Sequence, residues 1–207
     1  MYLSFNARAL GVTDLSPEET LAMEAGAGFG RVDLPVRDLV DSGSDPVAHR
    51  AKVEELNLRG GAFSLPMNRR GSSSDFARDP GRFPGCAESA AVLGLKRTGT
   101  WVMPDTPERP DGAEARQAHL SETVAEHVDR LGAVARVLDA RGIRIGPAVI
   151  GVSSSRTGRG LPFVHRMADL DRVLGAVWHE APNFGVLMDV FHSTRPGRPS
   201  RRRWRGV

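Results

Sequence analysis

Cysteine and long apolar runs are scarce in this chain of 207 residues, and each scarcity excludes a class of protein. Cys86 stands alone, so the disulfide framework of a small secreted domain cannot form. No apolar run approaches the ~20 residues of a membrane-spanning helix. The N-terminal MYLSFNARAL has neither the basic nor the apolar region of a signal peptide. We therefore expect a cytoplasmic protein with no membrane partner.

Positive charge is concentrated at the C-terminal end of the chain. Residues 193–207, STRPGRPSRRRWRGV, hold six arginines and no acid, and subtracting those six charges from the formal net charge of +3 leaves −3 for residues 1–192. We expect residues 1–192 to form one domain with no specific affinity for nucleic acid. Residues 193–207 are expected to be a disordered Arg-rich tail, whose abrupt change of composition is also what a shifted reading frame would produce.

Strand-like and helix-like segments alternate six times along residues 1–192. The expected strands are 2–6, 31–36, 61–67, 97–104, 143–151 and 184–190. The helices between them are expected at 17–26, 46–56, up to Leu93, at 113–140 and at 167–178. Strands separated by helices pair in parallel through right-handed crossovers. The pattern therefore predicts an α/β protein, either an open doubly wound sheet or an incomplete eightfold barrel.

Two helix starts carry specific signals. Ser16, Pro17 and Glu19 form a capping box with proline at the first helical position. Asp45 and Pro46 open the next helix, with Val47, Ala51 and Leu56 expected on one face. The helix at 113–140 has apolar residues at steps of three and four, which is typical of one buried stripe.

Several segments, taken in order, resemble the xylose isomerase-like TIM barrel family. They are EETLAMEAGAGFGRVDLPV, LNLRGGAFSLPM, RTGTWVMP, VLDARGIRIGPAVIG, RTGRGLPFVHRMADLDRVL and NFGVLMDVFH. The resemblance covers roughly residues 1–192 and implies a (β/α) TIM-barrel fold, incomplete and C-terminally truncated, with about six of the eight βα units. It also implies sugar or sugar-phosphate isomerase or epimerase chemistry, with a divalent metal (Mn, Mg or Zn) at the top of the barrel.

The family pattern maps onto few residues of this chain. Asp189 matches a metal ligand, and His192 matches a residue that touches the substrate in related epimerases. Ala148 stands where the family has a glutamate that ligates the metal and exchanges protons. Because a methyl group cannot abstract a proton, the resemblance implies an impaired or inactive enzyme. The family's histidine on the seventh strand and glutamate on the eighth have no counterpart.

Each candidate residue also has an ordinary structural interpretation. Asp189 could cap the turn after its strand, and His192 could be a hydrogen-bonded histidine at a strand end. Arg156 and Arg159, in SSSRTGRG, could hold a phosphate or a sugar hydroxyl, or lie on a solvated loop. Trp101 could stack against a sugar, pack in the core or form a surface that contacts a helix.

Three functions remain open from the sequence. The first is a sugar or sugar-phosphate isomerase/epimerase-like protein. The second is a non-catalytic binding or assembly protein on the same partial barrel, including a homo-oligomer. The third is a nucleic-acid enzyme like endonuclease IV, which is a more distant relative in fold and whose additional His and acidic ligands are not visible here.

Overall fold

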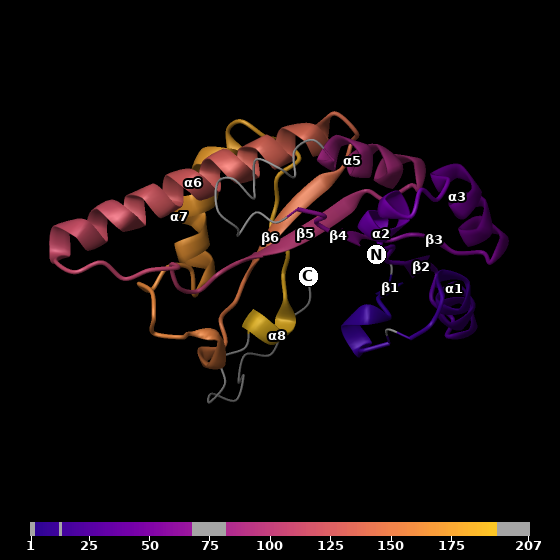
Figure 1. The fold of residues 1–207 in the computed structure, drawn as a ribbon, viewed down its shortest axis with the longest axis horizontal. Helices are drawn as coiled ribbons and strands as arrows, with labels where there is room; N and C mark the ends of the chain where they lie inside the picture. The colour runs from indigo at the N-terminus through magenta and orange to yellow at the C-terminus, as the bar shows by residue number, and fades with distance from the viewer. Residues whose placement is uncertain (1–2, 13, 68–81, 194–207) are drawn as a thin grey trace, which may run out of the picture. The chain divides into compact units, whose positions relative to one another are not determined.

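The computed structural model describes residues 3–12, 14–67 and 82–193 (Figure 1). The chain forms two compact units, one of Met1–Gly99 with Val134–Gly146 and one of Thr100–Ala133 with Pro147–Val207. The Arg-rich tail from residue 194 lies outside the described residues.

The first sheet consists of three short parallel strands in the order β1-β2-β3. They are β1 Ser4–Phe5, β2 Arg31–Val32 and β3 Arg59–Gly60. The helices around them in sequence are η1 Arg8–Leu10, α1 Pro17–Gly26, α2 Val36–Asp41 and α3 Pro46–Glu55. Helices separate β1 from β2 and β2 from β3, as the alternation in the sequence predicts.

Both helix starts with a specific signal are confirmed. The Ser16 hydroxyl accepts the Glu19 N–H, and the Glu19 carboxylate accepts the Ser16 N–H, which closes the capping box. The Asp45 carboxylate accepts the Val47 N–H at the start of α3. The face of α3 that carries Val47 is exposed, since Val47 itself is 63% exposed, and the helix buries His49 and Val53 instead.

The second sheet has the order β4-β5-β6. Its strands are β4 Phe63–Ser64, β5 Arg97–Val102 and β6 Arg144–Val149. β4 runs parallel to β5, and the Thr98 hydroxyl donates to the Phe63 carbonyl at 2.7 Å. Helices α5 Phe83–Val92 and α6 Ala113–Asp139 connect these strands, and α6 confirms the long helix expected at 113–140. The last helices are α7 Met167–Trp178 and α8 Val190–Ser193, with η2 Ser153–Ser155 before them.

Three expected strands differ from the structure. The strand expected at 31–36 ends after Val32, because Pro35 precedes a helix that begins at Val36. The strand expected at 61–67 is only Phe63–Ser64, and Arg59–Gly60 just before it pairs with β2 in the other sheet. The segment 184–190 forms no named strand, although the Leu187 N–H donates to the Pro147 carbonyl at 3.0 Å and places the segment beside β6.

The two units have separate sets of buried apolar side chains. In the first unit Val32, Leu58 and Leu95 are almost fully buried, together with the lone Cys86. In the second unit Leu170, Val173, Leu174 and Val177 of α7 are buried. Burial of these apolar side chains stabilises the short strands, because a two-residue strand pairing contributes few hydrogen bonds.

One carboxyl group is buried in the first unit. Glu24 of α1 has no exposed surface, and neither of its oxygens has a hydrogen-bond partner among the described residues. Burial raises the pKa of Glu24 to about 7; the Ala7 backbone N–H, which lies near the carboxyl but does not reach hydrogen-bond geometry, partly opposes this shift, and the negative charge of Asp33 adds to it. Glu24 is therefore an acid whose ionisation is unfavourable in the folded state.

The elements establish an α/β fold in which parallel strands alternate with helices, as the sequence predicts. Within the described ranges, no helix is both long enough and apolar enough to cross a membrane.

Candidate functional site

The candidate site in the second unit lies where β6 ends. Leu187 is hydrogen-bonded to Pro147, the residue before Ala148, so the chain leading to Asp189 runs beside the last residues of β6. Ala148 in β6 is fully buried, whereas Asp189, two residues after Leu187, is partly exposed. Residues 148 and 189 therefore belong to neighbouring segments near the same end of β6.

Asp189 and His192 contact each other across the first turn of α8. The Asp189 carboxylate accepts the His192 N–H at 3.2 Å, and its second oxygen lies 3.9 Å from Nε2 of the same residue. Both side chains are about one-fifth exposed, at 22% and 19%. Asp189 thus fills the turn-capping role that was its alternative interpretation, and His192 points its Nε2 towards that carboxylate. Their roles as metal ligand and substrate contact stay predictions.

Gly151 brings His192 close to the end of β6. A Cβ atom at this position would lie 2.2 Å from the His192 carbonyl oxygen and 3.4 Å from the His165 carbonyl oxygen. The Arg156 guanidinium donates to the Gly151 carbonyl at 3.1 Å. The absence of a side chain at residue 151 therefore lets the His192 backbone approach closely, while the Gly151 carbonyl binds Arg156.

The loop that carries both candidate arginines is fixed at its C-terminal end to the segment after β5. The Thr106 N–H donates to the Leu161 carbonyl at 2.9 Å, and the Phe163 N–H donates to the Pro104 carbonyl at 2.7 Å. Gly160 permits this pairing, because a Cβ atom there would lie 1.7 Å from the Thr106 carbonyl oxygen. Arg156 and Arg159 are both exposed on this loop.

Asp105 and His165 form a second acid–imidazole pair, which the sequence reasoning missed. Asp105 Oδ1 lies 3.5 Å from His165 Nε2, and the two side chains are 10% and 18% exposed. Asp105 Oδ2 accepts the N–H groups of Thr157 and Gly158. A signal was available, because Asp105 directly follows Pro104, which was expected to end the strand, and polar residues at strand ends often serve function in such folds.

Trp101 is separate from these contacts. It is 41% exposed on β5, and Met103, two residues along, is 38% exposed, so both lie on one side of the extended chain. Trp101 makes no ring contact and no hydrogen bond with the described residues. The core interpretation of Trp101 is therefore wrong, and its contact with a sugar stays a prediction.

The described residues do not fit the divalent metal that the family implies. No three His, Cys, Asp or Glu side chains in the described ranges lie close enough together to hold an ion. Asp189 and His192 could contribute one metal-ligating side chain each, and one Asp189 oxygen already accepts the His192 backbone N–H. Ala148 adds none. Mg²⁺ and Mn²⁺ prefer about six oxygen or nitrogen ligands, and Zn²⁺ about four, so this set is incomplete.

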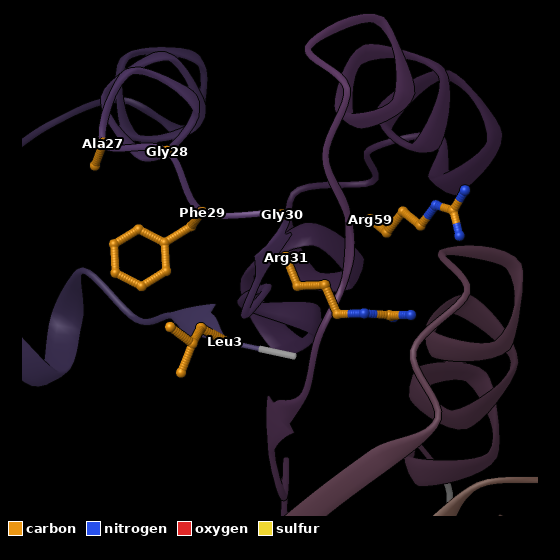
Figure 2. Close-up of a pocket in the computed structure, with 7 residues that line it drawn as sticks. All are labelled: Leu3, Ala27, Gly28, Phe29, Gly30, Arg31 and Arg59. Carbon is orange, nitrogen blue, oxygen red and sulfur yellow. The ribbon is translucent and has the colours of Figure 1, made fainter. Parts of the chain in front are cut away.

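The first unit has a polar cluster and a pocket of its own. The Asp33 carboxylate, at the end of β2, accepts hydrogen bonds from Ser4 Oγ at 2.6 Å and from the Ala62 N–H at 2.8 Å. The pocket, of about 580 Å³, lies at the opposite, N-terminal ends of the strands (Figure 2). Its lining residues are Leu3, Ala27, Gly28, Phe29, Gly30, Arg31 and Arg59. None of the predicted site residues lies in this pocket.

Comparison with known proteins identifies the fold. A xylose isomerase domain protein from Alicyclobacillus acidocaldarius superimposes with a TM-score of 0.75 and 25% sequence identity. The IolI protein with a bound zinc atom has a TM-score of 0.67 and 16% identity. D-psicose 3-epimerase in the presence of D-fructose has a TM-score of 0.66 and 13% identity.

Each comparison covers 93% of this chain and 64% of the solved structure, so the chain spans a little under two thirds of the length of these proteins. No protein-family model and no curated protein sequence matches the chain. The expected fold, a partial TIM barrel like those of the xylose isomerase-like proteins, is confirmed by these structures.

Proposed function

Starting from the fold shared with the xylose isomerase-like TIM barrels, we propose that this chain is a sugar- or sugar-phosphate-binding protein with impaired isomerase or epimerase activity. The proposed ligand site is the end of β6, and the observation that carries it is the approach of His192, Arg156 and His165 to Gly151. TIM barrels place their ligands at the C-terminal ends of their strands, which is the position of these residues.

The chemistry available at this end is hydrogen bonding and charge. The imidazole of His192 is oriented by Asp189, so it can donate to or accept from a sugar hydroxyl. The guanidinium groups of Arg156 and Arg159 offer a rigid fork of donors to a hydroxyl or a phosphate oxygen. D-Psicose 3-epimerase, whose solved structure was obtained with D-fructose, supports a polyhydroxylated ligand.

Proton transfer is the step that Ala148, at the position of the family's glutamate, cannot perform. Isomerisation of a sugar moves a proton between neighbouring carbons, and epimerisation removes and returns one beside a carbonyl. Both need a positioned base, which typically contributes about 10²–10⁴-fold to the rate. Ala148 occupies the position of the family's glutamate and has no group that accepts a proton. We therefore expect turnover that is slower than in a complete enzyme by at least that factor.

A divalent ion contributes little in this proposal. Asp189 and His192 would be its only side-chain ligands among the described residues, and the IolI protein shows only that a relative in fold binds zinc. Calorimetric titration with Mn²⁺, Mg²⁺ and Zn²⁺ tests this point. Stoichiometric binding in the micromolar range would contradict it.

Binding and turnover can be measured separately. Ketohexoses and their phosphates are titrated by calorimetry, and loss of the proton next to the carbonyl is followed by NMR in D₂O. His192→Gln should abolish sugar binding, whereas His179→Gln, an exposed histidine of the same unit, should leave it unchanged. A wild-type turnover number in the ordinary enzyme range of about 1–10³ s⁻¹ would refute the impaired activity. Binding that survives His192→Gln would refute the site.

A non-catalytic assembly protein is the second candidate, and it is favoured by exposed apolar side chains in the second unit. Met188, Val190 and Phe191, within four residues of one another, are 62%, 77% and 71% exposed. Such a group is commonly covered by a partner. Light scattering tests this candidate: a dimer that dissociates in Phe191→Ser supports it, and a monomer at all concentrations contradicts it.

A further inference from the structure

The loop that carries Arg156 and Arg159 is wound around one buried carboxylate. Asp105 Oδ2 accepts the Thr157 N–H at 2.7 Å, the Thr157 hydroxyl at 3.4 Å and the Gly158 N–H at 3.3 Å. Gly158 has a φ of +68°, the left-handed conformation that turns two successive N–H groups towards one acceptor. Three donors on one oxygen fix the path of the loop between the two arginines.

Asp105 is itself held from the other side. Its side chain is 10% exposed, and its Oδ1 lies 3.5 Å from His165 Nε2. Its backbone forms an antiparallel bridge with Pro162, and the neighbouring Thr106 is hydrogen-bonded to Leu161. Asp105 is therefore held by contacts other than those it makes with Thr157 and Gly158.

The contacts continue from the carboxylate to both arginines. The Thr157 hydroxyl, which bonds to Asp105, also accepts the Arg159 N–H at 3.2 Å. Arg156 is fixed through its guanidinium to the Gly151 carbonyl and through its N–H to the Ser153 carbonyl. Both arginine backbones are thus held before any ligand arrives, which lowers the entropy lost on binding.

We propose that Asp105 is a positioning residue that holds Arg156 and Arg159 for the phosphate group of a sugar phosphate. This inference rests on the proposed function and assigns the ligand class of the same site. Arginine pairs suit a phosphate monoester, because the planar guanidinium can donate two parallel hydrogen bonds to its oxygens.

The charge of Asp105 and its positioning role predict opposite changes in phosphate affinity when Asp105 is replaced. A carboxylate near the arginines repels an anion, so replacing it with a neutral side chain should tighten phosphate binding by charge alone. If Asp105 acts by holding the loop, the same replacement weakens binding. The two effects are opposite in direction, so one titration distinguishes them.

The experiment compares Asp105→Asn with Asp111→Asn, an exposed aspartate of the same unit, in calorimetric titrations with inorganic phosphate at low ionic strength. We expect Asp105→Asn to weaken phosphate binding about tenfold, the loss of roughly one charge-assisted hydrogen bond's contribution. Hydrogen exchange at the Thr157 and Gly158 amides should also accelerate. Asp111→Asn should change neither quantity. Unchanged or tighter phosphate binding in Asp105→Asn would overturn the inference.

Two further measurements keep the result decisive. Thr157→Val retains the charge and removes only the hydroxyl that links Asp105 to Arg159, so it should weaken phosphate binding even if Asp105→Asn does not fold; unchanged binding would overturn the inference. A parallel titration with a neutral ketohexose separates the two proposals. Sugar binding without phosphate binding overturns this inference and leaves the proposed function standing, whereas binding of neither ligand overturns both.

Discussion

Replacing Glu24 with glutamine should change how the stability of the first unit depends on pH. Glu24 is fully buried with no hydrogen-bond partner for its oxygens among the described residues, and burial raises its pKa to about 7. In the unfolded chain the same carboxyl ionises near 4.5. Glutamine has nearly the same shape and does not ionise, so it isolates the effect of the charge.

The direction follows from proton linkage. Between pH 4.5 and about 7 the folded state holds a proton that the unfolded state has released, so raising the pH favours unfolding. The stability that Glu24 contributes is complete below pH 4.5 and is lost as the pH rises through 7. Each pH unit in this interval is worth 1.36 kcal/mol, so the total loss is about 3 kcal/mol.

The measurement is urea denaturation followed by far-UV circular dichroism at pH 4 and pH 8.5. The free energy of unfolding of Glu24→Gln relative to wild type should rise by about 3 kcal/mol between these two values. The comparison of two pH values cancels any constant cost of burying the amide. Glu55→Gln, an exposed glutamate in the same unit, is the control and should show no such rise. A difference for Glu24→Gln that does not change with pH would refute the reasoning.

Two other substitutions test the packing and the loop. Burial lowers the pKa of His49; the Glu18 carboxylate partly opposes this shift and the Lys52 ammonium adds to it, so stability should fall as the pH drops below 6.5. His49→Gln should reduce this fall in the same urea assay, and an unchanged pH profile would contradict the assignment. Gly160→Ala places a Cβ atom 1.7 Å from the Thr106 carbonyl oxygen, so it should lower the stability of the second unit by roughly 2 kcal/mol or more. Gly175→Ala, where no atom lies within 4 Å, is its matched control, and equal melting temperatures for the two variants would disprove the close approach.

Local signals predicted the helices well because the residues that carry them act over one turn. Ser16 with Glu19, and Asp45 with Val47, make the capping contacts that the sequence suggests. The spacing of apolar residues likewise predicted α6, in which Leu131 and Leu138 are fully buried. These features need no knowledge of the rest of the chain.

Strand lengths and the candidate site depend on contacts between residues far apart in the sequence, which local patterns do not reveal. The apolar run 184–190 predicted a buried strand, yet Met188 and Val190 are mostly exposed, and Val190 begins a helix. Such a run becomes a strand only where neighbours cover it. The Asp105–His165 pair joins residues 60 positions apart, which spacing alone could not bring together.

The close approach of the His192 carbonyl to Gly151 limits which amino acids evolution can place at position 151. The smallest possible addition, one methyl group, would displace the carbonyl of His192, whereas the carbonyl of His165 would stay at ordinary contact distance. We therefore expect position 151 to remain glycine as the rest of the chain varies, because every other amino acid carries a Cβ atom.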